Sequence, residues 1–270
     1  MAFSVNTNVG ALVALRNLNT SSMLLEETQN RVSTGLKVIG AKDNASSFAI
    51  AQGLRADIKA NAAVQQGLSN GKGVVDVAIA GATALSNLLT DMKKKVVEGM
   101  NAANTAQQQT ILDADYTQLK AQFNTFITNA VFNGKNLISA ASTALSVIST
   151  TSGGTISVAA QDMQVVSSTF TSISTTTIAA TELTKVDAAI TSVSTALGAL
   201  GGSSRSLTFQ NDFINSIADA LQEGLGAVVD ADLAKESAML QSLQVKQQLG
   251  VQALAIANKA PEILLGLFRG

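Results

Sequence analysis

Serine and threonine, whose hydroxyl groups can be modified, are the residues of this chain that most clearly could take part in chemistry. They cluster in the middle of the chain. Between Ser139 and Thr181 nearly half of the residues are Ser or Thr, and Asp162 is the only charged one. This composition permits two interpretations, a surface that accepts O-linked sugars or a weakly constrained loop. On the first interpretation the candidate acceptors are Thr150, Thr151, Ser167, Ser168, Thr169, Thr171, Ser172, Thr175, Thr176 and Thr177.

Two short motifs resemble ligand sites but lack essential residues. The stretch 70–73 contains the Gly-Lys pair of a phosphate loop, but Gln66 replaces the first glycine and no Ser or Thr follows Lys72. Asp113 and Asp115 are spaced like the start of a calcium loop, but no glycine or closing glutamate follows them. We interpret the first motif as a turn or helix irregularity, and the second as an acidic first helical turn.

The residue types that are missing narrow the chemistry further. The chain contains no His and no Cys, which excludes His-based acid–base catalysis, thiol catalysis and the usual zinc sites. The net charge is −1, so the charge balance does not point to nucleic acid or to an acidic membrane surface. We therefore expect a structural protein and not an enzyme, with no cofactor and no metal.

Most of the chain is predicted to form long helices. Apolar residues make up 46% of the chain and aromatic residues only 4%, and the only proline is Pro261. Between Leu183 and Val228 two sets of positions step by seven, which is the signature of a coiled-coil helix. The first set is Leu183, Ile190, Leu197, Ser204, Asn211, Ala218 and Leu225, and the second is Val186, Val193, Leu200, Leu207, Ile214, Leu221 and Val228. The register breaks at 229–232, where we expect a hinge or a change of packing partner, and restarts at Leu233.

The N-terminal half predicts a matching pair of helices. Heptad positions between Val75 and Gly99 give the first helix, and an apolar face from Leu112 to Ala130 gives the second, which should end near Asn133-Gly134. Short links suggest antiparallel neighbours in a bundle. Alternation in the stretches 144–149 and 155–159 predicts a β-hairpin around a two-residue Gly153-Gly154 turn, and 167–177 reads as exposed and strand-prone or irregular.

Both chain ends are unusually apolar. Termini are normally polar and frayed, whereas a helix that is apolar on every side has to be buried. Burial between many copies of the same chain satisfies this need and produces a filament. The residues expected to carry assembly are Val5, Val9, Leu12, Leu15, Leu18, Leu25, Leu240, Val251, Leu254, Leu264, Leu265 and Phe268. The first positive charge is Arg16, so the N-terminus does not look like a cleaved secretory signal, and we expect no membrane-spanning segment.

Several motifs at both ends of the chain resemble those of bacterial flagellins and follow one another in the order found in that family. At the N-terminal end they are Val5-Asn6-Thr7-Asn8, the stretch 31–38, the stretches 41–45 and 49–51, and Phe132-Asn133-Gly134 with Leu137. At the C-terminal end they are the stretches 230–234, 244–247, 252–258 and 261–264. The resemblance covers about residues 1–137 and 183–270. It implies a short flagellin without large outer domains, which polymerises into the flagellar filament for swimming motility.

The resemblance also implies an architecture and partners. The expected fold is mainly α, a long coiled-coil-like helical bundle with paired N- and C-terminal helices and a small β-hairpin region. Residues 1–42 and 231–270 would form an inner-tube helix pair, and residues 43–230 a rod that includes the Ser/Thr-rich segment 138–182. Implied partners are other copies of the chain or other flagellins, an export chaperone at the C-terminal helix, and the cap and hook-junction proteins. Export would follow the flagellar type III route. The alternatives are the hook–filament junction protein and a membrane-active helical hairpin.

Overall fold

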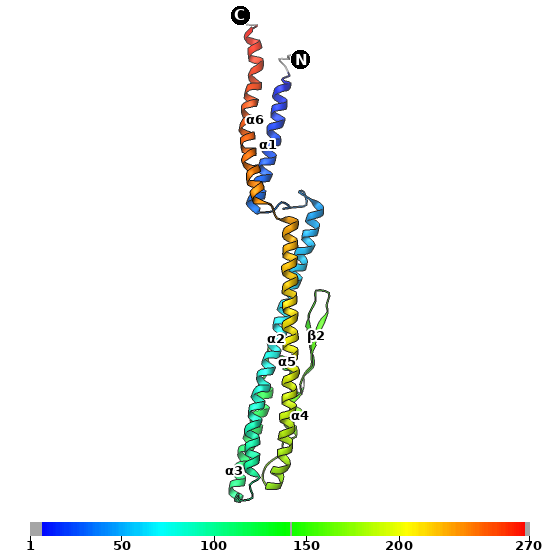
Figure 1. The fold of residues 1–270 in the computed structure, drawn as a ribbon, viewed down its shortest axis with the longest axis vertical. Coiled ribbons are helices and arrows are strands. Elements are labelled where there is room, and N and C mark those ends of the chain that lie inside the picture. The colour runs from blue at the N-terminus through cyan, green and yellow to red at the C-terminus, as the bar shows by residue number, and fades with distance from the viewer. Residues whose placement is uncertain (1–6, 141, 268–270) are drawn as a thin grey trace. The chain divides into compact units, whose positions relative to one another are not determined.

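The computed structural model describes the backbone of residues 7–140 and 142–267. The chain divides into two compact units, residues 1–56 with 221–270 and residues 57–220, which we call the terminal unit and the rod unit. The helices are α1 (Val9–Thr34), α2 (Ala45–Gly99), α3 (Ala106–Asn129), α4 (Met163–Ser168), α5 (Thr176–Val229) and α6 (Leu233–Leu267), and the strands are β1 (Leu145–Ile148) and β2 (Thr155–Val158) (Figure 1). The predicted fold class, mainly α with one small hairpin, is confirmed.

The terminal unit pairs the two ends of the chain as antiparallel helices. Near the start of α1, Asn8 Nδ2 donates to the carbonyl of Ala257 at 2.7 Å. Further along, Gln247 Nε2 donates to Ser22 Oγ at 3.3 Å, and near the end of α1 Arg31 lies 3.4 Å from Glu236. These contacts connect α1 to α6 along its length.

The predicted register break at 229–232 is confirmed as the point where α5 ends and α6 begins. The Val229 carbonyl accepts a hydrogen bond from Lys37 N at 2.7 Å, and Ala231 N donates to the Gly35 carbonyl at 2.8 Å. Gly35 ends α1 in the left-handed conformation at φ 72°, which a residue without Cβ adopts most easily. The side chain of Asp232 then caps the first turn of α6.

The core of the rod unit follows the two heptad patterns. Buried side chains of α2, among them Leu85 and Leu89, face buried side chains of α5 such as Val193 and Leu200. The third helix, α3, adds Phe123, whose ring meets Phe170 edge-to-face at 5.5 Å. By length and composition one stretch of α2 would also pass for a membrane span, but the core helix of a soluble protein meets the same criteria.

The predicted end of α3 was wrong by about four residues. The helix ends at Asn129, and Asn133 and Gly134 instead lie at φ 47° and 73° in a tight turn that pairs Phe132 with Lys135. Two successive residues with positive φ are typical of a hairpin turn rather than a helix cap. The side chain of Asn136 donates to the Ile127 carbonyl at 2.6 Å, which satisfies part of the last turn of α3.

Two predictions within the Ser/Thr-rich segment were also wrong in detail. The hairpin is present, but its strands pair Ile148 with Thr155, so the connection is longer than a two-residue glycine turn. Ser149 and Gly154 extend the pairing, and the reversal runs through 150–153. The stretch 167–177 is not a strand but, as the alternative had it, largely irregular between the end of α4 and the start of α5. Most of it is exposed as predicted, but Ser167, Phe170 and Ile173 are buried.

Candidate assembly site

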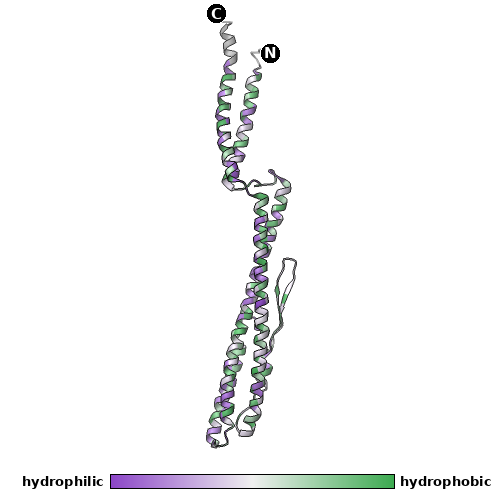
Figure 2. Cartoon of the chain, in the orientation of Figure 1, coloured by the Kyte–Doolittle hydropathy of each residue, from purple (hydrophilic) through white to green (hydrophobic). Residues whose placement is uncertain are grey.

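The helix pair of the terminal unit exposes apolar side chains along both helices. Val9 is 67% exposed on α1, and Ile256 is 72% exposed on α6. The other large apolar residues exposed on this pair are Leu12, Val13, Leu15, Met23, Leu24, Leu233, Met239, Val245, Leu249 and Val251. Figure 2 shows apolar residues spread over both helices of the pair. Apolar area of this kind on a folded unit marks a surface made for contact with another molecule.

Geometry explains why these residues stay exposed in one copy. Each helix of a two-helix pair can cover only one side of the other. Among the described side chains of α1 and α6 only Leu25, Thr28 and Leu243 are buried. The remaining apolar surface is therefore left for contacts outside the chain.

The structure divides the residues predicted for assembly into two groups. Leu25 is buried and Leu18, Leu240 and Leu254 are half-buried within the described part of the pair. The exposed group consists of Val9, Leu12, Leu15 and Val251. Val5, Phe268 and the side chains of Leu264 and Leu265 lie outside the described residues. The predicted set does not include the exposed residues Met23, Leu233, Met239, Val245 and Leu249. It also leaves out Val13, Leu24 and Ile256, although these three belong to the apolar end stretches on which the prediction rests.

The second candidate site is the Ser/Thr-rich stretch of the rod unit. Its hydroxyl groups fall into two classes, those that are buried or hydrogen-bonded and those that are exposed and make no hydrogen bond. Ser167 is buried, and its Oγ donates to Asn124 Oδ1 at 2.6 Å. Ser168, Thr169 and Thr175 bond within their own turns, Thr150 accepts from Gly154 N, and Ser172 meets Ser174. Among the described residues, the hydroxyls of Thr151, Thr176 and Thr177 make no hydrogen bond and their residues are exposed.

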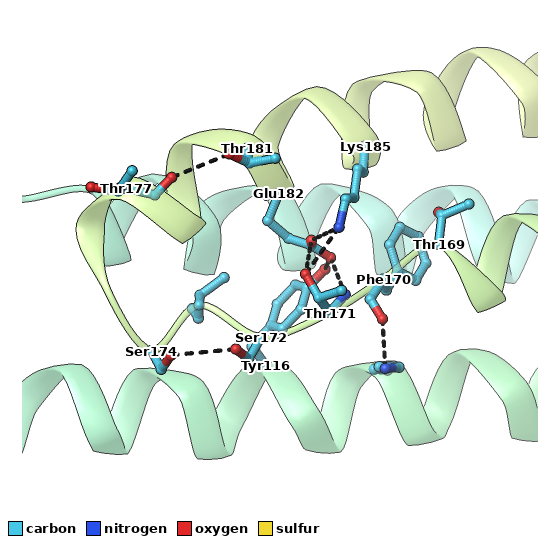
Figure 3. Close-up of polar contacts among 12 residues, drawn as sticks. Tyr116, Thr169, Phe170, Thr171, Ser172, Ser174, Thr177, Thr181, Glu182 and Lys185 are labelled. Carbon is cyan, nitrogen blue, oxygen red and sulfur yellow. Dashed lines mark hydrogen bonds and ion pairs between the residues drawn. The ribbon is translucent and has the colours of Figure 1, made fainter.

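A buried glutamate holds the loop before α5 in place. Glu182 is fully buried and accepts from Tyr116 Oη at 2.7 Å, Thr171 N at 2.9 Å and Thr171 Oγ1 at 2.7 Å (Figure 3). Lys185 Nζ lies 3.0 Å from the same carboxylate. Burial acts to raise the pKa of Glu182, but these donors together outweigh it and lower the pKa below its ordinary value. Burial, together with the bond to Glu182, raises the pKa of Tyr116.

Comparison with known proteins decides between the functional interpretations. A family model described as the bacterial flagellin N-terminal helical region matches residues 5–143, and one described as the C-terminal helical region matches residues 183–268. The chain belongs to the bacterial flagellin family. It is 39% identical to flagellin FljO of Caulobacter vibrioides over 98% of both chains. It is also 36% identical to a flagellin of Brucella melitensis over 99% of both chains.

A solved structure with a similar fold is that of a putative flagellar hook-associated protein from Vibrio parahaemolyticus. The TM-score is 0.59, and the match covers 70% of this flagellin and all of that chain. At 15% identity this likeness shows the fold alone. The curated relatives above, which match from end to end, are flagellins, so neither the junction protein nor a membrane-active hairpin is favoured.

Membership of the family gives this flagellin its role. It is a structural subunit that associates with itself and polymerises into the extracellular filament of the bacterial flagellum, which serves motility. The apolar surface of the helix pair and the self-association of the family are two independent observations. Together they raise the question of which contacts this surface makes in the filament.

Proposed function

We propose that copies of this flagellin contact one another chiefly through α1 and α6. The observation that carries the proposal is the apolar surface that both helices leave exposed in the single copy. Full burial of one Val, Leu or Ile side chain contributes about 1.5–3 kcal/mol. A dozen such residues per copy supply ample driving force, even after the entropy of ordering the helices is deducted. No single contact has to be strong.

The proposed division of labour follows the register break at 229–232. Residues 1–42 and 231–270 form the inner tube of the filament, and residues 43–230 form the rod outside it, with the Ser/Thr-rich segment 138–182 as its variable part. The break supports this division because a heptad helix that continued through it would keep one packing partner along its whole length.

The same surface accounts for the partners we propose outside the filament. An export chaperone binds α6 before export, because the exposed apolar face of this helix would otherwise cause aggregation before it contacts other copies in the filament. The cap and hook-junction proteins contact the same helix ends, as implied by the family. Export proceeds by the flagellar type III route without a cleaved signal peptide, and we expect no catalytic activity.

For the Ser/Thr-rich stretch we propose Thr151, Thr176 and Thr177 as the acceptors of O-linked sugars. Their hydroxyls are exposed and have no partner among the described residues. Ser167 is not an acceptor in the folded rod because its hydroxyl is held by Asn124 inside the core. Of the remaining candidates, Thr171 bonds to Glu182, and the others bond within their own loops and turns.

Intact mass of the exported protein, with electron microscopy of the same sample, tests this account. We expect filaments whose subunits have an N-terminus that no signal peptidase has cut. Any added mass should map by peptide sequencing to the peptides that carry Thr151, Thr176 and Thr177. Removal of an N-terminal segment, or a sugar on Ser167, would contradict the respective part of the proposal. A subunit without added mass would favour the weakly constrained loop.

A further inference from the structure

Two phenylalanines of α5 lie where a coiled-coil helix normally carries polar residues. Leu207 and Ile214 occupy the buried positions of the heptad. Phe209 and Phe213 fall on the outer positions and are 71% and 59% exposed. They are four residues apart and therefore share one face of the helix. In a rod that stays alone in water, charged or polar residues belong at such positions, so the two rings indicate a partner.

The surface around the two rings supports a close approach. Asp212 lies on the same face, three residues after Phe209, and is exposed and without an ion pair in the described part of the chain. On this face, Gly202 lies about one turn before Arg205, and Gly198 lies about two turns before it. A Cβ added at either glycine would meet nothing in the same copy. Glycine inside a helix costs stability relative to alanine, and neither position has a packing reason within the described part of the copy. The glycines leave room for the backbone of another molecule.

The rod unit also carries a hollow that fits this surface. It lies between α2, the Phe132–Lys135 turn and the β-hairpin, and its volume is about 520 Å³. A cavity of about 150 Å³ holds one benzene molecule, so this hollow has space for two phenyl rings. Gly71 lines it and allows the hairpin to pack close, since a Cβ there would lie 2.6 Å from Val147 Cγ2. Phe132 and Ile148, both exposed, form part of its apolar wall.

One pair of opposite charges, Asp212 and Lys135, matches the two surfaces, although Arg205 on the face of the rings has the same sign as Lys135. Lys135 is the one charged residue among the described residues that line the hollow, and it is exposed and without an ion pair there. Asp212 is its counterpart beside the rings. The two surfaces lie at the same level of the rod unit, because Gln65 bonds to Asn215 at 2.8 Å and Gln210 bonds to the Ser149 carbonyl at 2.8 Å. None of the described residues that line the hollow comes from α5, so the rings and the hollow belong to different surfaces.

We propose that Phe209 and Phe213 of one copy insert into the hollow between α2 and the hairpin of a neighbouring copy, with Asp212 pairing with its Lys135. A patch that fits a pocket elsewhere on the same chain makes a head-to-tail contact, which repeats from copy to copy. The proposal rests on the self-assembly of the family, but not on the contact proposed above for α1 and α6. It gives the rod unit a lateral contact of its own.

Seeded growth of filaments from purified monomer tests the proposal. The quantity measured is the critical concentration, which is the monomer concentration that remains in solution when growth has stopped. The double variant F209S/F213S should raise that concentration about tenfold or more, because two buried rings are lost per contact. Its thermal unfolding as a monomer should match that of the unchanged chain, since both rings are exposed there. Filament growth equal to that of the unchanged chain would overturn this inference and leave the proposed role of α1 and α6 intact.

A charge swap provides the matched control. D212K and K135D should each raise the remaining monomer concentration several-fold, and the combined variant D212K/K135D should restore it to within about twofold. A combined variant that grows no better than either single one would overturn the pairing.

Cross-linking locates the contact directly, because the chain has no cysteine of its own. Filaments grown from a mixture of F213C and I148C monomers should yield disulfide-linked dimers that join position 213 to position 148. Dimers joining 213 to 213 would show a symmetric contact instead, and filaments without cross-links would show that the surfaces do not meet. Either result overturns the proposal.

Discussion

Replacement of Leu254 by Asp should abolish filament formation and leave the rod unit folded. Leu254 is half-buried on α6, in the stretch where Gly250 approaches Leu18 of α1. A carboxylate there has to be dehydrated both within the helix pair and between copies, which costs several kcal/mol for each subunit. A loss of about 3 kcal/mol raises the monomer concentration needed for growth about 100-fold. Sedimentation after seeding measures this effect.

The rod unit should not respond to this change. Its core cluster draws its described buried residues from 64–214 and includes none from α6. Circular dichroism of the monomer should therefore show the same main unfolding transition for the unchanged chain and for the Leu254→Asp variant. The control is Gln252→Asp, which adds the same charge at an exposed polar position two residues away and should have a much smaller effect. Normal filaments from the Leu254→Asp variant would contradict the proposal that α6 takes part in the contact between copies.

Replacement of Glu182 by Ala should destabilise the rod unit by about 3 kcal/mol, the second large effect we expect. The change leaves the buried hydroxyl of Tyr116 and the partly buried amide of Thr171 without their acceptor. Each unsatisfied buried group costs about 1–3 kcal/mol. For a unit of this size such a loss lowers the unfolding temperature by about 6–12 °C. Thermal unfolding followed by circular dichroism measures it.

An ion pair between α2 and α5 provides the control for Glu182. Asp187 lies 2.7 Å from Lys93, but both side chains are nearly half exposed. Exposed pairs contribute at most about 1 kcal/mol, so Asp187→Ala should shift the unfolding temperature by only a few degrees. Equal effects of the two substitutions would show that the buried network around Glu182 contributes nothing beyond a surface pair.

The same glutamate makes the stability of the rod unit depend on pH. Its pKa is lower in the folded state than its ordinary value of 4.5, so below that pH the unfolded chain binds the proton more readily. The contribution is complete above pH 4.5 and is lost as the pH falls through the lower folded pKa. Urea unfolding at neutral pH and at about pH 3 should therefore show a smaller difference between the native chain and Glu182→Ala in acid. A constant difference would contradict this coupling.

The long helices could be predicted because one physical signal governs them. Heptad spacing from Leu183 to Val228 gave both the helix and its buried face, and the break at 229–232 gave its end. The end of α3 could not be predicted in this way. The sequence Asn133-Gly134 suits either a helix cap or a hairpin turn, and only the structure shows that both residues have positive φ, which identifies the turn.

The candidate sites were predictable to different degrees. Apolar residues on every face of the end helices pointed to assembly, but only the paired structure distinguishes the buried Leu25 from the exposed Leu12. The stretch 167–177 has no clear periodicity, so the sequence could not show that Ser167 is buried and Thr177 is exposed. Glu182 also lacked a signal, because Tyr116 comes from α3 and Thr171 from a loop, and only Lys185 lies on the same helix.

Electron cryo-microscopy of the native filament tests the central claim most directly. The account predicts that the exposed apolar side chains of α1 and α6, with Val9, Leu12 and Ile256 as the clearest markers, are buried against helices of other copies. It also predicts that α1 and α6 lie innermost in the filament. A map in which these helices face the outer solvent, with Val9 and Ile256 in contact with water, would contradict it.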